Sequence, residues 1–311
     1  MWERRSRRAQ TEIQRARRTA AGQRGSSVCL VNRLLGTTET PIGAAEFVSS
    51  CGEIIDTFDR TEVSGNVSWI VGTPTGEFFV KSAGTTAPPT EGRPVPYFDH
   101  VGRVRLLRNA VEVAASCDHR ALARLRNVVE TRDGPVLVYD RAPGELVGTP
   151  REHRSDPTSP YRRFAALPAE RHVPLVCELF EAHVALAAAG WIACDLYDGC
   201  LIVDVSANRL TLIDLDTYAR GPFVNEMGRM FGSDVFMAPE EHVLGAHIDQ
   251  RTTVFTLGRL ALHFGTATTD DPTTYVGGVD RAAVLVRATS PDPSDRYPDV
   301  AALTSAYVSA A

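Results

Sequence analysis

A single lysine stands out among the side chains that could do chemistry. The chain has 33 basic side chains, Lys and Arg together, and Lys81 is the only lysine. An ammonium is a compact charge on a flexible stem and suits contact with phosphate oxygens, whereas the planar guanidinium of arginine is not interchangeable with it. A single lysine therefore indicates a specific use. The residues around Lys81 in the sequence must show what that use is.

Four short stretches with charged or polar centres follow one another along the sequence. Residues 77–82 spell EFFVKS, residues 190–204 spell GWIACDLYDGCLIVD, residues 212–216 spell LIDLD and residues 232–240 spell GSDVFMAPE. In this order they resemble the lysine strand, catalytic loop, metal-binding segment and activation-segment end of the protein kinase superfamily. One such stretch has little specificity, but four in one order resemble most closely the bacterial serine/threonine protein kinases.

The resemblance implies an α+β chain with the bilobal protein-kinase-like fold, a small β-rich N-lobe followed by a larger α-helical C-lobe. On this basis residues 28–140 form the N-lobe, which binds the ATP phosphates. Residues 141–311 form the C-lobe, with the catalytic loop and the activation segment. Residues 1–27, with eight arginines, are expected to form a basic, disordered tail or an arm for an acidic partner.

Apolar periodicity predicts the elements. Residues 52–83 predict strands with a turn at Thr73–Gly76, and residues 101–115 predict a helix because apolar residues recur at helical spacing. Residues 136–139 predict a buried strand, and residues 148–172, with four prolines, predict an exposed loop. The C-terminal part is predicted as a helix over 174–189, strands at 201–203 and 210–213, and further helices.

The resemblance also implies a role for each charged residue. Lys81 contacts the α- and β-phosphates of ATP, and Glu112 on the next helix is its expected ion-pair partner. Asp195 takes the place of the catalytic base, which orients an acceptor hydroxyl and accepts its proton. Asp214 takes the place of the metal-binding aspartate, since Mg²⁺ prefers carboxylate oxygens. The alternatives are a solvated helix charge for Glu112 and a turn cap for Asp195.

Further ATP contacts are expected at the loop formed by Gly65, Asn66, Val67 and Ser68. It has one glycine where protein kinases usually have three, and its backbone N–H groups could cradle phosphates. The alternative for this loop is an ordinary hairpin turn.

Adenine is expected to lie against the segment that links the two lobes. Its hydrogen-bond partners would be backbone groups of Tyr139, Asp140 and Arg141. The ring would lie between apolar side chains, namely Val67 and either Leu201 or Ile202, with Leu212 and Ile213 as alternatives.

The metal site departs from the kinase pattern. Cys200 stands where an asparagine normally supplies a second metal ligand, and a thiol is a poor ligand for Mg²⁺. Asp216 or Asp198 could supply the missing carboxylate, with Mn²⁺ as an alternative metal. The other alternative is a site with one metal, or with none that is catalytically useful.

The predicted catalytic loop also departs from the kinase pattern. Tyr197 replaces the lysine expected two residues after the catalytic aspartate, and Ala193 and Cys194 replace the His-Arg pair before it. Thr253 replaces the aspartate that braces this loop in kinases. A pseudokinase that binds nucleotide without transfer is therefore one alternative, and a small-molecule phosphotransferase is another.

The stretch at 232–240 favours a protein acceptor, because small-molecule kinases usually lack it. Its glutamate, Glu240, is expected to form a structural ion pair with Arg296 in the late Asp-Arg-Tyr stretch.

Composition limits the other function classes. The formal net charge of −5 gives no reason to expect nucleic-acid binding. No apolar run is long enough to span a bilayer, and no apolar stretch follows the basic start as in a secretory signal. The six cysteines form no C-x-x-C pair, so free thiols in a reducing cytoplasm are expected.

Overall fold

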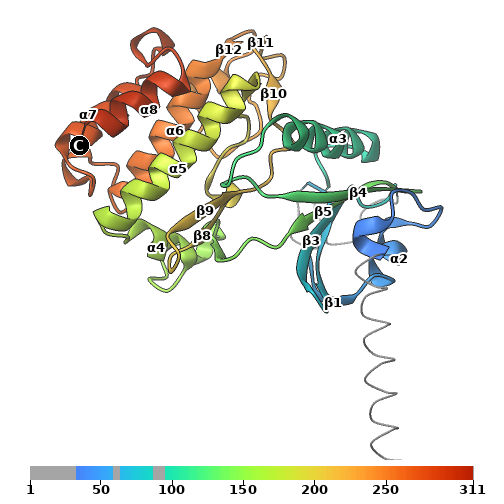
Figure 1. Ribbon diagram of the computed structural model, residues 1–311. Coiled ribbons are helices and arrows are strands. Elements are labelled where there is room, and N and C mark those ends of the chain that lie inside the picture. Colours follow the sequence, from blue (N-terminus) through green and yellow to red (C-terminus); the bar gives the residue numbers. More distant parts are fainter. Residues whose placement is uncertain (1–32, 59–63, 87–94, 311) are drawn as a thin grey trace, which may run out of the picture. The chain divides into compact units, whose positions relative to one another are not determined.

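The computed structural model describes residues 33–58, 64–86 and 95–310. The chain is a mixed α+β protein with an antiparallel sheet, and it groups into two compact units (Figure 1). The strand-rich unit comprises the described residues up to Leu107 together with Arg124–Arg141. The helical unit comprises Arg108–Ala123 and residues 142–310. Residues 108–123 thus group with the helices, although they were predicted within the N-lobe; the predicted tail 1–27 lies outside the described residues.

The strand-rich unit is built on a five-stranded antiparallel sheet with the order β1-β2-β3-β5-β4. The predicted turn closes β2 and β3, where Thr73 pairs with Gly76. The φ of Gly76 is 144°, a conformation open to glycine at low cost. The strands are β1 (Glu53–Phe58), β2 (Val67–Thr73), β3 (Gly76–Ser82), β4 (Leu125–Thr131) and β5 (Gly134–Asp140).

The hydrophobic core of this unit lies on one face of the sheet. Helix α2 (Ala44–Ser49) contributes Phe47 and Val48, which pack with strand residues such as Val80 and Val138. Because side chains alternate along a strand, the neighbours of these core residues point to the other face. Lys81 directly follows Val80, so it lies on the face opposite the core.

The helical unit packs five helices and part of α3 (His100–Ser116) around a large apolar core. Its short strands form three small sheets: β6-β8-β9, β7 with β10, and β11 with β12. The helices are α4 (Pro160–Ala165), α5 (Ala169–Ala188), α6 (Gln250–Gly265), α7 (Val279–Ala288) and α8 (Val300–Ser309). The strands are β6 (Glu145–Leu146), β7 (Trp191–Ile192), β8 (Leu201–Asp204), β9 (Arg209–Leu212), β10 (Ala219–Arg220), β11 (Phe223–Val224) and β12 (His247–Ile248). Single 3-10 turns are η1 (Arg151–His153), η2 (Asp198–Cys200), η3 (Pro239–His242), η4 (Pro272–Thr274) and η5 (Pro293–Asp295).

The predicted exposed loop at 148–172 was wrong in its middle, where α4 forms, and at its end, where α5 begins at Ala169. The hydroxyl of Ser159 accepts a hydrogen bond from the N–H of Arg162, and Pro160 is the first helical residue. Serine at the N-cap and proline in the first turn are helix-start signals. Tyr161 and Phe164 are buried, so this short helix belongs to the core.

The expected ion pair between Glu240 and Arg296 is confirmed. It is bidentate: the two Nη atoms of Arg296 lie 2.7 and 2.9 Å from the two carboxylate oxygens, and both residues are buried. The hydroxyl of Thr252 donates to the same carboxylate. The guanidinium also donates to the carbonyls of Arg251, Ser290 and Pro291. The two charges are therefore satisfied without water.

None of the helices among the described residues has the length and apolar character that a membrane-spanning helix needs. The five cysteines among these residues are all free thiols.

Removing one partner of the buried Glu240–Arg296 pair leaves the other charge without compensation. We expect Arg296→Met to lower the free energy of unfolding by about 3–5 kcal/mol, measured by urea denaturation. The control is Arg229→Gln, because Arg229 pairs with Asp234 on the surface, where ion pairs contribute little. A loss no larger in Arg296→Met than in the control would contradict a structural role for the pair.

Candidate active site

The predicted catalytic loop and metal-binding segment leave the same end of the β8–β9 hairpin. Leu201 pairs with Leu212, so Asp195 precedes the first strand and Asp214 follows the second at the same end. The N–H of Ile213 donates to the carbonyl of Cys200 at 2.9 Å. Antiparallel pairing thus continues beyond the hairpin and brings the two segments side by side.

A second hydrogen bond ties the two segments farther along. The hydroxyl of Thr217 donates to the carbonyl of Cys194 at 2.9 Å. One residue of the metal-binding side therefore reaches the residue directly before Asp195. The two predicted acids are carried on segments joined at two points.

Both acids have an uncommon backbone conformation. The φ of Asp195 is 56° and that of Asp214 is 63°, in the left-handed region that non-glycine residues rarely adopt. Residues in such conformations occur preferentially at functional sites, where the surrounding structure holds them.

Cys200 lies close to three carboxylates. Burial raises the pKa of its thiol well above the usual value, and the charges of Asp214, Asp195 and Asp216 raise it further. The thiol therefore stays protonated, and it donates a hydrogen bond to the carbonyl of Asp195 at 3.4 Å. Cys200 thus stabilises the loop, which is a different role from that of a metal ligand.

Asp198 is placed where a metal ion would not reach it. Its side chain is fully buried, and both of its oxygens accept hydrogen bonds from Nη2 of Arg154, at 3.1 and 2.9 Å. Burial raises the pKa of Asp198 despite the nearby Arg154. The structure therefore argues against the predicted use of Asp198 as a metal ligand.

Asp214 and Asp216 remain as the candidate metal ligands. Among residues 33–58, 64–86 and 95–310, no group of three or more His, Cys, Asp or Glu side chains is arranged to hold a metal ion. Mg²⁺ in kinase sites usually takes one or two carboxylates, and the phosphates and waters complete its shell. The donor chemistry of these two aspartates fits that arrangement.

Thr253 braces the catalytic loop from α6. Its buried hydroxyl accepts a hydrogen bond from the N–H of Ala193 at 3.1 Å, two residues before Asp195. A neutral hydroxyl thus supports the loop at the position where the kinase pattern has a carboxylate.

Asn109 on α3 is a contact that sequence reasoning missed. Its side-chain amide donates to the carbonyls of Asp216, at 2.9 Å, and Tyr218, at 2.6 Å, and so holds the segment after Asp214. Asparagine on an amphipathic helix has no distinguishing sequence signal. Glu112, the predicted partner of Lys81, lies one turn farther along the same helix and is exposed.

In the strand-rich unit, Lys81 lies half-buried on the sheet face opposite the core. It pairs with Ser68 on β2 and with Leu137 on β5. Cross-strand neighbours share a face, so Ser68, one of the predicted phosphate-loop residues, flanks the ammonium-bearing side chain.

The predicted phosphate loop contains an unsatisfied polar atom. Asn66 is 4% exposed, and its Oδ1 has no hydrogen-bond partner among the described residues. Gly65 has a φ of 75°, and a Cβ there would lie 2.5 Å from Cγ of Pro96. Val67 then begins β2. The tight backbone at Gly65 and the orphaned amide oxygen favour a ligand-binding loop over an ordinary turn.

Arg103 anchors this region and was also missed. It is 6% exposed, and its guanidinium donates to the carbonyls of Ala83, Phe98 and Thr85. These carbonyls lie on the chain that leads from β3 into α3. Arg103 thereby fixes the segment that directly follows the lysine strand.

The expected adenine contacts are less well supported. The N–H of Asp140 donates to the carbonyl of Arg124, and that of Arg141 donates to the carbonyl of Glu77. Both N–H groups are thus already engaged within the strand-rich unit. Tyr139 pairs with Phe79 and Leu125 in the sheet.

Leu201 packs in the core of the helical unit and is 1% exposed. Because side chains alternate along β8, Ile202 points to the other face and is half-buried. Ile202 therefore remains the better candidate for an apolar contact with the ring.

Comparison with known proteins adds no assignment. No family model matches the chain, and no curated protein matches it. What the geometry itself provides is two linked acidic segments in the helical unit. In the strand-rich unit it provides Lys81 next to Ser68, in a loop where the buried Oδ1 of Asn66 has no hydrogen-bond partner among the described residues.

Thr253→Val removes the acceptor and leaves the N–H of Ala193 buried and unpaired. We expect the free energy of unfolding to fall by about 1–3 kcal/mol, measured by chemical denaturation, and Thr253→Ser to restore most of it. The matched control is Thr256→Val on the same helix, because the Thr256 hydroxyl donates within the helix to the carbonyl of Thr252. Equal losses of unfolding free energy in the two valine variants would contradict the role of Thr253 in supporting the loop.

Glu241 follows Glu240 and is almost fully buried. Its carboxylate accepts a hydrogen bond from the N–H of Ala238 at 2.7 Å. Burial raises the pKa of Glu241 to about 8, and the charges of Glu240 and Asp195 raise it as well. The carboxyl is therefore protonated in the folded protein at neutral pH.

A raised pKa in the folded state makes stability fall as pH rises. The contribution of Glu241 is fully present below its unfolded pKa, near 4.5, and is lost as pH rises to about 8. We expect thermal midpoints measured from pH 5 to 8 to decrease less in Glu241→Gln than in the unchanged protein. The exposed Glu152 supplies the control variant Glu152→Gln; the same flattening in that control would rule out Glu241 as the cause.

Proposed function

We propose that the chain is an ATP-dependent kinase that transfers the γ-phosphoryl group to a hydroxyl of a protein Ser or Thr. The observation that carries the proposal is the pair of left-handed aspartates, Asp195 and Asp214, on two linked segments at one end of the β8–β9 hairpin. Their order and spacing resemble the catalytic loop and metal-binding segment of serine/threonine kinases.

The reaction follows from the chemistry of these groups. Asp195 orients the acceptor hydroxyl and takes its proton, while the hydroxyl oxygen forms a bond to the γ-phosphorus. The bond from the γ-phosphorus to the bridging oxygen breaks, and ADP leaves with the electron pair. Lys81 holds phosphate oxygens through its ammonium. Asp214 and Asp216 would hold Mg²⁺, which would supply positive charge against the phosphate oxygens.

The protein acceptor is supported by the stretch that ends in Glu240. The buried pair with Arg296 fixes this stretch, and small-molecule phosphotransferases usually lack it. We place the enzyme in the cytoplasm, where ATP and free thiols coexist.

A nucleotide-binding pseudokinase is the second candidate. Cys200 donates to a carbonyl instead of binding metal. Burial raises the pKa of Tyr197 far above its usual value, so a neutral phenol stands where kinases have a lysine. These two features weaken phosphoryl transfer more than they weaken binding of the phosphates.

Transfer from labelled ATP to the protein itself, to generic proteins and to small acceptors tests the proposal. We expect labelled protein, and a loss of roughly 10²–10⁴-fold in rate for Asp195→Asn because general-base catalysis contributes that much. Lys81→Ala and Lys81→Arg should both lose activity, since a guanidinium does not replace the ammonium. Asp156→Asn, at an exposed aspartate, serves as the matched control.

Thermal shifts with ATP, alone and with Mg²⁺ or Mn²⁺, separate the candidates. A shift without transfer would favour the pseudokinase. Labelling of a small acceptor but of no protein would favour a small-molecule phosphotransferase. The absence of transfer to any acceptor would overturn the kinase proposal, and the absence of a shift as well would count against nucleotide binding.

A further inference from the structure

A buried ion pair between Arg154 and Asp198 holds the predicted catalytic loop. Asp198 lies three residues after Asp195, within η2, and its side chain is fully buried. Nη2 of Arg154 bridges both carboxylate oxygens, and Nε of Arg154 donates to the carbonyl of Thr149 at 2.9 Å. A buried carboxylate of this kind depends on its cation, because it has no access to water.

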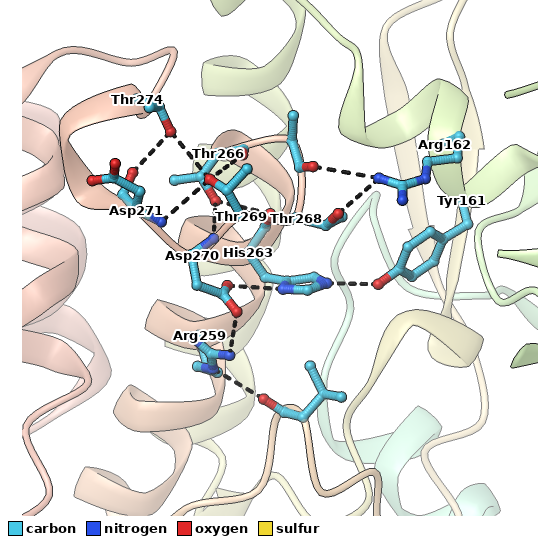
Figure 2. A network of polar contacts seen from close by, with 12 residues as sticks. Tyr161, Arg162, Arg259, His263, Thr266, Thr268, Thr269, Asp270, Asp271 and Thr274 are labelled. Atoms are coloured by element: carbon cyan, nitrogen blue, oxygen red, sulfur yellow. Dashed lines mark hydrogen bonds and ion pairs between the residues drawn. The ribbon is translucent and has the colours of Figure 1, made fainter. Parts of the chain in front are cut away.

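The guanidinium of Arg154 is itself supported by α4 and α6. It lies over the ring of Tyr161, 4.7 Å from the centroid. The hydroxyl of Tyr161 is 2.6 Å from Nε2 of His263, and Nδ1 of His263 is 2.8 Å from Asp270 (Figure 2). A cation–aromatic contact and two short hydrogen bonds therefore back the arginine.

The network continues to the stretch that contains Glu240. Asp270 accepts a hydrogen bond from Nη2 of Arg259 at 2.8 Å, and Nε of Arg259 donates to the carbonyl of Val235 at 3.0 Å (Figure 2). Successive contacts thus run from Asp198 in the catalytic loop to Val235 in the 232–240 stretch.

The backbone of this loop has close neighbours at Gly199. A Cβ on Gly199 would lie 2.3 Å from the ring of Tyr197, and one on Gly148 would lie 2.7 Å from Cα of Gly199. The loop backbone is therefore closely packed next to Asp198, which lies three positions after Asp195.

We propose that Arg154 is a positioning residue that fixes the loop carrying Asp195, and that Tyr161, His263 and Asp270 hold Arg154 in place. The inference rests on the proposed kinase function. Arg154 acts through Asp198 and does not contact the reacting groups. The pairing also assigns Asp198 a structural use.

The test compares three variants of the full chain in the labelled-ATP transfer assay. Arg154→Met should lower kcat between about 10- and 100-fold, because small displacements of catalytic groups cost this much, while KM for ATP changes less than about two-fold. The double variant Arg154→Met/Asp198→Asn removes the uncompensated charge. It should regain most of the lost thermal stability but little of the lost kcat.

The control is Arg120→Met. Arg120 pairs with Glu178, another carboxylate that is 3% exposed, at 3.0 Å and outside the catalytic loop. This variant should lose stability with kcat nearly unchanged. Recovery of kcat together with stability in the double variant, or equal kcat in Arg154→Met and Arg120→Met, would overturn the positioning role.

Failure of the proposed function is distinguishable from failure of this inference. If the unchanged protein transfers no phosphate, the kinase proposal fails, and hydrogen exchange at the N–H of Cys200, which donates to the carbonyl of Tyr197, tests the loop directly. Exchange should be faster in Arg154→Met than in Arg120→Met. Equal exchange in the two variants would refute the positioning role.

Discussion

The buried ion pair between Glu240 and Arg296 is the constraint on which the helical unit depends. Its two charges are fully matched, and the remaining donors of the guanidinium find backbone carbonyls. Buried pairs add little net stability over an apolar alternative, but a half-satisfied pair is strongly unfavourable. The pair therefore specifies one arrangement of the 232–240 stretch, α6 and the chain near Arg296.

Neutral side chains make two of the hydrogen bonds that hold the predicted catalytic loop. Thr253 accepts from one side of the loop, and the Cys200 thiol donates to its carbonyl from within. Kinases use charged or amide side chains at the corresponding positions. The loop is thus held by neutral hydrogen bonds together with one buried charge pair, Arg154–Asp198.

Sequence patterns predicted the features that depend on local order. Periodicity predicted the β2–β3 hairpin and the two strands around the acids. The Glu240–Arg296 pair, whose members lie 56 residues apart, was expected only from the kinase resemblance. The partners of Asp198 and Asn109 were missed, because neither periodicity nor that resemblance indicates Arg154 or the carbonyls of Asp216 and Tyr218. The meeting of Lys81 with the acids around one nucleotide stays a prediction.

The left-handed backbone at Asp195 and Asp214 places a conformational cost at the two predicted acids. Each conformation costs about 1 kcal/mol or more for a residue with a Cβ, and glycine would adopt it without that cost. A glycine at either position would therefore relieve the backbone but would remove the carboxylate. A chain that retains carboxylates at both positions accepts a lasting structural tension there, and selection for stability alone would remove it.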